Sequence, residues 1–251
     1  MDRFLTQPPE FIRLLAHDLR WQLLKALTRG DQRVQELVTL VAEPMNLVSY
    51  HLKKLRDDGV VNMRRSEADG RDVYYSLDMG RLRDLFQAAG SALHPGLGGA
   101  ALMPSSAAIP ARRVLFVCTH NSARSQMAEA LMRHTAGEQF QVYSGGSHPT
   151  HIHPDAIRSM DALGIDMRSQ HSKDLSQFEG HTFDTVITVC DRAREICPVF
   201  PGEAEQIHWG FPDPARIENA ANRRRAFDHI AQQLTTRIDY FLAALVQTDG
   251  G

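Results

Sequence analysis

The sequence contains few cysteines and no long hydrophobic run. It has three cysteines in 251 residues, and none precedes position 118. This number and placement argue against a framework of structural disulfides and indicate reactive or buried thiols in a reducing compartment. No run of about 18 apolar residues occurs and the N-terminus lacks a signal-peptide pattern, so we expect a cytoplasmic protein with no membrane partner.

An excess of charge of one sign is also lacking. The formal net charge is −2 at pH 7, and 43% of the residues are hydrophobic and 23% charged, as in ordinary globular proteins. This balance excludes a general polyanion binder but leaves room for a local basic face. The length of 251 residues suits one large or two modest domains.

One stretch near the middle contains no charge and no sustained hydrophobic period. Residues 90–110 read GSALHPGLGGAALMPSSAAIP, which is dense in Gly, Ala, Ser and Pro. Such a composition predicts a flexible linker over 91–111. We therefore expect one domain over 1–90 and a second over 112–251.

The first domain has a mostly helical pattern. Leucines recur at three- and four-residue steps from Leu14 to Leu27, which predicts one or two helices ending near Gly30. Further helices are expected over 34–41, from Pro44 to Gly59 and around 81–89, with strands over 60–65 and 72–77. These elements predict a mainly α winged helix-turn-helix domain, whose last helix could pair with its first across a dimer.

A short motif supports this fold. Ser49-Tyr50-His51-Leu52, followed by Leu55 and Gly59-Val60-Val61, resembles the recognition helix and wing entry of the ArsR-like repressor family. The resemblance implies a homodimer, formed through this domain, with the helix in the major groove of double-stranded operator DNA. The expected DNA-binding residues are Asn46, Ser49, Tyr50, His51, Lys53 and Lys54 on the helix and Arg64, Arg65 and Arg71 on the wing.

The charge of this domain leaves another interpretation open. Basic and acidic residues nearly cancel over 1–95, so DNA affinity must come from local clustering. The alternative is the solvated face of a winged helix that binds protein. The helix over 34–41 also contains no cysteine, although many arsenic-sensing members of the family have a cysteine cluster there. Because As(III) requires thiolates, any sensing thiols must come from the second domain.

The second domain opens with a motif that favours catalysis. Cys118 follows the apolar run 114–117, and an amphipathic stretch follows the loop. A buried strand, a tight polar loop and a helix start aim backbone N–H groups at one point, which binds a tetrahedral oxyanion. The same potential lowers the pKa of a thiol, so we expect Cys118 to be a thiolate near neutral pH. The expected oxyanion-binding residues are Thr119, His120, Asn121, Ser122, Ala123, Arg124 and Ser125, of which Arg124 grips two oxygens.

The alternative to a catalytic loop is a buried cysteine without a function beside a solvated arginine. Several further motifs, however, match one family. Residues 118–125, 143–146, 162–166 and 209–215 are similar to the low-molecular-weight protein tyrosine phosphatase fold, and within it to the arsenate reductases. This resemblance implies an α/β three-layer domain with a parallel sheet. It also implies that Asp213 is a general acid protonating the leaving oxygen. Ala215 stands where the tyrosine phosphatases usually have an aromatic residue, which weakens a phosphotyrosine role.

The other two cysteines extend this resemblance. Cys190, Cys197 and Pro198 form a Cys-x6-Cys-Pro pattern similar to the redox pair of thioredoxin-coupled arsenate reductases. The resemblance implies reduction of arsenate to arsenite through Cys118, Cys190 and Cys197, with thioredoxin or a similar dithiol protein as reductant. No tightly bound cofactor and no metal are expected. Glu129 and Ser144 match positions around a cation site in some of these reductases, so potassium remains an alternative to the ammonium of Lys173.

The spacing of this pair makes a physical demand. If residues 191–196 were helical, the Cα atoms of Cys190 and Cys197 would lie about 10 Å apart. A disulfide needs them within about 7 Å. We therefore expect this segment to unwind or loop out when Cys190 and Cys197 join, and its polar composition predicts a low cost for detachment.

Two other classes of function stay open at this point. A plain phosphatase would need only Cys118, Arg124 and Asp213. Alternatively, the chain is mainly a repressor whose second domain senses arsenic or oxidation through its three cysteines.

Overall fold

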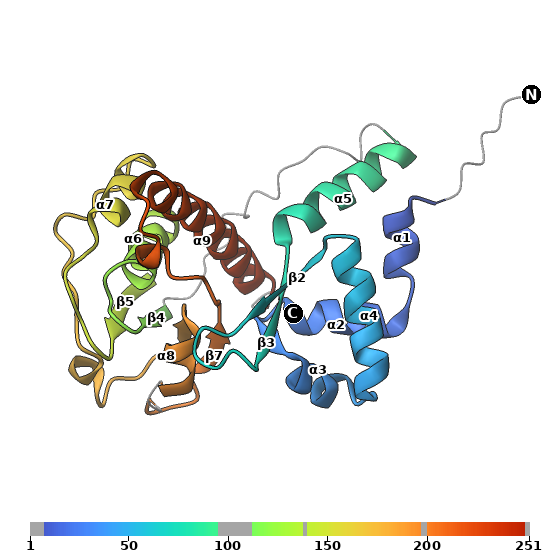
Figure 1. Ribbon diagram of the computed structural model, residues 1–251, viewed down its shortest axis with the longest axis horizontal. Coiled ribbons are helices and arrows are strands. Elements are labelled where there is room, and N and C mark those ends of the chain that lie inside the picture. The colour runs from blue at the N-terminus through green and yellow to red at the C-terminus, as the bar shows by residue number, and fades with distance from the viewer. Residues whose placement is uncertain (1–7, 95–111, 138–139, 197–199, 249–251) are drawn as a thin grey trace, which may run out of the picture. The chain divides into compact units, whose positions relative to one another are not determined.

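The computed structural model divides into two compact units, Met1–Met103 and Pro104–Gly251 (Figure 1). The structure describes residues 8–94, 112–137, 140–196 and 200–248. Most of the predicted linker, residues 95–111, lies outside these ranges, as does Cys197. Within the described part of the chain, no helix is both long enough and apolar enough to cross a bilayer.

The first unit is the expected mainly α winged helix-turn-helix. Its helices are α1 (Glu10–Leu15), α2 (Asp18–Leu27), α3 (Val34–Val41), α4 (Met45–Asp57) and α5 (Met79–Leu93), and its strands are β1 (Gln32–Arg33), β2 (Val61–Arg65) and β3 (Val73–Leu77). β2 and β3 form the antiparallel wing, and β1, which is too short for a sequence pattern, adds a third strand. The helix α5 extends beyond residue 91, where the linker was predicted to begin.

The sequence explains the position of α4. Pro44 immediately precedes the helix, and Gly59, with φ +72°, follows its end. Val48, Leu52 and Leu55 recur at helical spacing and are fully buried in the core of this unit. The opposite face of α4 is therefore left to solvent.

The second unit contains a four-stranded parallel sheet in the order β5-β4-β6-β7. Its strands are β4 (Arg112–Cys118), β5 (Phe140–Gly146), β6 (Thr185–Thr188) and β7 (Glu205–His208). The helices are α6 (Arg124–Ala136), α7 (Pro154–Asp161), α8 (Asp191–Ile196) and α9 (Ala220–Thr248), with short 3-10 helices η3 (Leu175–Phe178) and η4 (Pro214–Arg216). The first strand of the sheet, β4, lies between two later strands, so Cys118 ends the strand at the topological switch point, where ligands of such sheets bind.

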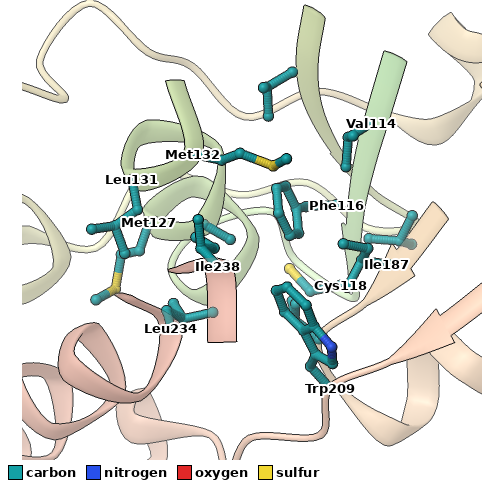
Figure 2. Packing of buried hydrophobic residues seen from close by; sticks show 14 of the residues in the cluster. Val114, Phe116, Cys118, Met127, Leu131, Met132, Ile187, Trp209, Leu234 and Ile238 are labelled. Carbon is teal, nitrogen blue, oxygen red and sulfur yellow. The ribbon is translucent and has the colours of Figure 1, made fainter. Parts of the chain in front are cut away.

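Side chains from both faces of the sheet complete a three-layer arrangement. Phe116 of β4 packs in one cluster with Met127 of α6 and Leu234 of α9 (Figure 2). Phe116 pairs with Ser144, and the next residue of β5, Gly145, faces the other way. A Cβ atom on Gly145 would lie 2.9 Å from Leu175 of η3, so η3 packs directly on that face. The predicted α/β three-layer domain with a parallel sheet is confirmed.

One predicted DNA-binding residue points into the first unit. The side chain of His51 is 5% exposed, and its ring lies 4.3 Å from the ring of His17. Burial lowers the pKa of His51, and the charges of His17 and Arg20 lower it further. The prediction that His51 contacts DNA was wrong, because the position falls on the buried face of α4.

The lowered pKa predicts a pH dependence of stability. The unfolded chain binds a proton more readily at this histidine, so the stability that neutral His51 contributes is present above about pH 6.5 and is lost as pH falls through the lower folded pKa. We expect His51→Gln to reduce this loss. Thermal unfolding followed by the fluorescence of Trp21, in a Trp209→Phe background, measures it. An equally steep acid dependence in His51→Gln and its parent would contradict the assignment.

Candidate active site and nucleic-acid interface

The loop after β4 surrounds the sulfur of Cys118. This side chain is 3% exposed, and its Sγ atom lies 2.9 Å from Ser125 Oγ. The backbone N–H of Asn121 donates to the same sulfur at 3.1 Å. The helix α6 begins at Arg124, so the loop residues 119–123 connect the sulfur directly to a helix N-terminus.

Asn121 fixes the conformation of this loop. Its φ of 46° lies in the left-handed region, which asparagine tolerates better than most residues. Its side-chain amide donates to Ser125 Oγ at 2.9 Å and to Ser144 Oγ at 2.8 Å. The amide oxygen accepts from Gln126 Nε2 at 2.8 Å and from the backbone N–H of Lys173 at 2.7 Å. One buried side chain thus ties the loop to α6, β5 and the segment before η3.

Close backbone approach is the second constraint on the loop. A Cβ atom on Gly146, at the end of β5, would lie 2.7 Å from the carbonyl oxygen of Thr119 and 2.8 Å from the backbone nitrogen of Asn121. Only glycine lets the loop approach the neighbouring strand in this way. The same stretch of loop is held by His148, whose backbone N–H donates to the Thr119 carbonyl at 2.9 Å.

Arg124 connects the loop to the segment that carries Asp213. The Arg124 guanidinium is buried, and its Nη1 donates to the Phe211 carbonyl at 2.7 Å. Its Nη2 lies 3.3 Å from Asp213 Oδ2. Asp213 also accepts from the backbone N–H of Ala215 at 3.2 Å, at the start of η4. The structure therefore brings Asp213, which lies far along the chain, to the loop that joins Cys118 and Arg124 at one end of the sheet.

Cys190 lies beside the same loop. Its buried Sγ is 3.4 Å from Thr119 Oγ1, the residue after Cys118. The strand β6 ends at Thr188, two residues before Cys190. Residues 191–196 form the helix α8, and Asp191 and Ala193 are buried, so detaching this segment costs more than its polar composition indicates. Its unwinding when Cys190 and Cys197 join stays a prediction.

The electrostatics of Cys118 differ from the expectation. Burial raises the pKa of the Cys118 thiol, and the neighbouring Cys190 thiol raises it further. Arg124, the Ser125 hydroxyl and the Asn121 N–H lower it, but the net direction is upward. The prediction of a thiolate near neutral pH is therefore not supported for the free site, because the desolvation of a buried sulfur outweighs these contacts.

Lys173 lies beside Glu129, one of the residues expected near a cation. Lys173 Nζ lies 3.2 Å from Glu129 Oε2 and donates to the His171 carbonyl at 3.1 Å. Glu129 also accepts from Ser144 Oγ at 2.5 Å and pairs with Arg133 at 2.6 Å. The geometry fits the ammonium of Lys173 as the cation of this site.

The first unit presents a polar surface on α4. The predicted DNA-contacting residues Asn46, Ser49, Tyr50, Lys53 and Lys54 are exposed together on this helix. On the wing, Arg65 and Arg71 are exposed, and Arg71 pairs with Asp69 at 2.8 Å. Arg64 instead pairs with the buried Asp31 at 3.2 Å and lies 4.8 Å from the ring of Tyr74. The Arg64 side chain is thus partly covered, and its role on DNA stays a prediction.

Two features of the second unit escaped the sequence analysis. The first is the Phe211 carbonyl that accepts from Arg124. It is a backbone group, so the type of residue at this position does not predict the contact. The buried contact between Asp191 and His208 joins α8 to β7, and neither residue belongs to a motif with a known spacing. The one available signal for this contact is the position of His208 at the end of a strand, immediately before Trp209 of the 209–215 motif.

These features define a class: a parallel α/β enzyme fold with a cysteine under an oxyanion-binding loop, an arginine in the loop and an aspartate opposite. Residues 113–249 match the model of the family described as low molecular weight phosphotyrosine protein phosphatase, and the chain belongs to this family. Residues 17–63 match the model described as bacterial regulatory protein, arsR family.

Individual proteins are similar to this chain. The arsenate reductase of Halalkalibacterium halodurans is 36% identical over 129 residues, which cover 51% of this chain and 93% of the relative. A solved arsenate reductase in its oxidized state is 28% identical, covering 53% of this chain and 98% of that chain, with a TM-score of 0.48. The thioredoxin-dependent arsenate reductase of Corynebacterium glutamicum is 22% identical, covering 86% and 95% of the two chains, with a TM-score of 0.44.

The contact between Ser125 and Cys118 predicts a measurable effect. Ser125→Ala removes a hydrogen bond that lowers the pKa of Cys118, so ionisation needs a higher pH. We expect alkylation of Cys118 by iodoacetamide to slow about tenfold at neutral pH, as for loss of a hydrogen bond to a charged group. The rate is measured against pH in a Cys190→Ser, Cys197→Ser background. Ser147→Ala, which removes a nearby hydroxyl that bonds His148 instead, is the control; equal profiles for both variants would contradict the prediction.

Proposed function

We propose that the second unit reduces arsenate to arsenite through a relay of Cys118, Cys190 and Cys197. The observation that carries this proposal is the position of Cys190: its sulfur contacts Thr119, so two thiols meet at one oxyanion loop. A phosphatase needs only one thiol there. The similarity to arsenate reductases supports the same reaction.

The first step uses the loop and the two charged side chains around it. Arsenate binds to the backbone N–H groups of residues 119–125, and Arg124 exchanges its contacts with Phe211 and Asp213 for two arsenate oxygens. The Cys118 thiolate attacks arsenic. Asp213, released from Arg124, gives a proton to the departing oxygen, which leaves as water.

The later steps transfer two electrons to arsenic. The Cys190 thiolate attacks Cys118 Sγ, the sulfur–sulfur bond forms, and the electron pair of the sulfur–arsenic bond passes to arsenic, which leaves as arsenite. Cys197, which lies outside the described residues, then attacks Cys190 Sγ and frees Cys118. A thioredoxin-like dithiol reduces the resulting Cys190–Cys197 disulfide. No tightly bound cofactor takes part, and Lys173 serves in place of potassium.

Hydrolysis of phosphoesters is the second candidate. It is favoured by the complete set of Cys118, Arg124 and Asp213, and by the family description of a phosphotyrosine phosphatase. Ala215, which follows the Asp213-Pro214 pair, offers no ring for stacking on phosphotyrosine. A small phosphoester is therefore the better phosphatase substrate.

The first unit binds double-stranded operator DNA as a homodimer in this proposal. The exposed face of α4 enters the major groove, while Arg65 and Arg71 contact phosphates. The absence of cysteine from α3 leaves the thiols of the second unit as the candidate arsenic sensor. Enzyme and regulator joined in one cytoplasmic chain would serve the same resistance response.

The relay is tested by thioredoxin-coupled turnover. We expect NADPH consumption, with thioredoxin and thioredoxin reductase present, to depend on arsenate. Cys118→Ser abolishes the reaction, whereas Cys190→Ser and Cys197→Ser allow at most one stoichiometric event, because the oxidising equivalents cannot leave. Ser147→Ala is the matched control. Sustained turnover by Cys190→Ser would exclude the relay, and hydrolysis of para-nitrophenyl phosphate without arsenate turnover would favour the phosphatase.

DNA binding is tested through its salt dependence. Lys53 is exposed on α4, so Lys53→Gln leaves one phosphate without its cation and lowers the slope of log K against log salt by about 1. The affinity of the full chain for mixed-sequence double-stranded DNA is measured by fluorescence anisotropy between low and moderate salt. Lys25→Gln, the same change on the exposed side of α2, leaves the slope unchanged. Identical slopes for the two variants would contradict this assignment of the interface.

A further inference from the structure

A buried charge pair adjoins the second thiol of the site. His208, at the end of β7, is 5% exposed, and Asp191, the first residue of α8, is 2% exposed. His208 Nε2 lies 3.1 Å from Asp191 Oδ1, and His208 Nδ1 lies 2.9 Å from Thr188 Oγ1. Asp191 directly follows Cys190 in the chain. Neither residue has a role in the relay described above.

The hydrogen-bond partners of His208 allow it to be charged. The Ile207 carbonyl lies 3.3 Å from Thr188 Oγ1 and can accept the one proton of this hydroxyl. The Thr188 oxygen can then accept from His208 Nδ1–H, while His208 Nε2–H donates to the Asp191 carboxylate. A histidine that donates from both nitrogens is an imidazolium. The pair is then neutral overall, which fits its burial, since an uncompensated buried carboxylate is strongly unfavourable.

This pair acts on the environment of Cys190. The Cys190 sulfur accepts from the backbone N–H of Ala193 at 3.4 Å and contacts Thr119 Oγ1, so the first turn of α8 sets its direction. A carboxylate on the adjacent residue opposes formation of a thiolate, and the His208 charge cancels that field. The charged or titratable side chains of the elements around this pair include Cys118, Arg112 and Arg113 on β4, Glu205 on β7, and Arg192, Arg194 and Glu195 on α8.

We propose that the Asp191–His208 pair is a positioning device for Cys190. The imidazolium neutralises the carboxylate beside the sulfur, and the pair anchors the first turn of α8 to β7. The inference rests on the proposed function in so far as Cys190 attacks Cys118. Asp191 and His208 touch neither arsenate nor the reacting sulfur atoms, so they are positioning residues.

The test measures Cys190 directly, without arsenate. In a Cys118→Ser, Cys197→Ser background, the rate of Cys190 alkylation by iodoacetamide is followed across pH by intact mass. His208→Gln removes a positive charge from beside the Asp191 carboxylate, so we expect alkylation to slow about tenfold at neutral pH, with its midpoint at higher pH. Asp191→Asn removes the carboxylate, so alkylation is not slowed. The double variant, with an amide pair in place of the ion pair, returns to the background rate.

Matched controls and a second assay complete the design. His181→Gln and Glu205→Gln make the same chemical changes at exposed positions and leave alkylation unchanged. A purely structural role predicts slowing in both single variants without rescue in the double, and this result, or no slowing in His208→Gln, would overturn the inference. If His208→Gln fails to fold, Asp191→Asn still separates the two accounts, because charge compensation predicts an undiminished rate.

Two activity assays separate a failure of the proposed arsenate reduction from a failure of the proposed role of the Asp191–His208 pair. In the otherwise unchanged chain, His208→Gln lowers arsenate turnover several-fold but leaves hydrolysis of para-nitrophenyl phosphate, which needs Cys118 alone among the thiols, at the parent rate. A parent chain that does not reduce arsenate removes the proposed function while the alkylation series still decides the role of the pair. Equal loss of both activities in His208→Gln would overturn the inference.

Discussion

The second unit depends on one buried side chain, the amide of Asn121. Both the nitrogen and the oxygen of this amide form hydrogen bonds within the protein. The amide nitrogen donates to Ser125 and Ser144, and the amide oxygen accepts from Gln126 and Lys173. These bonds offset the cost of a left-handed backbone at a non-glycine residue. Because the backbone N–H of Asn121 also points at Cys118, the same residue that shapes the loop sets the field at the sulfur.

Two opposing effects act on the pKa of Cys118 in the free site: the contacts of the loop lower it, and burial of the sulfur raises it. Burial raises the pKa of Cys118 although three groups stabilise its thiolate, so the sulfur remains protonated more readily than a loop rich in N–H donors suggests. Arg124 meanwhile binds the Phe211 carbonyl and Asp213. In the proposed reaction, an arriving oxyanion replaces these contacts and so frees the carboxyl of Asp213 to act as the acid. Under this proposal, substrate binding and activation of Asp213 are the same event.

Sequence reasoning recovered what periodicity and motif spacing encode. The helices of the first unit follow from apolar patterns, and the meeting of Cys118 with Arg124 follows from one loop motif, whereas the parallel sheet was implied by the family resemblance of several motifs. Sequence reasoning failed where the rotation of a helix decides: His51 is a polar residue of the predicted interface, but it faces the core of the first unit. Neighbouring positions of a helix or strand point in different directions, and the sequence alone does not fix that rotation.

The segment around Cys190 shows why burial must be known before mobility is inferred. Its letters, Asp191 to Ile196, read as a solvated helix that could detach easily, and this expectation set a low cost for bringing Cys190 and Cys197 together. With Asp191 held by His208 and Ala193 in the core, detachment must break a buried ion pair as well as expose apolar surface. In the proposed relay, the cost of forming the Cys190–Cys197 disulfide is therefore tied to the same Asp191–His208 pair that we propose as the positioning device for Cys190. Under these proposals, a contact that favours attack by Cys190 on Cys118 opposes the rearrangement that follows it.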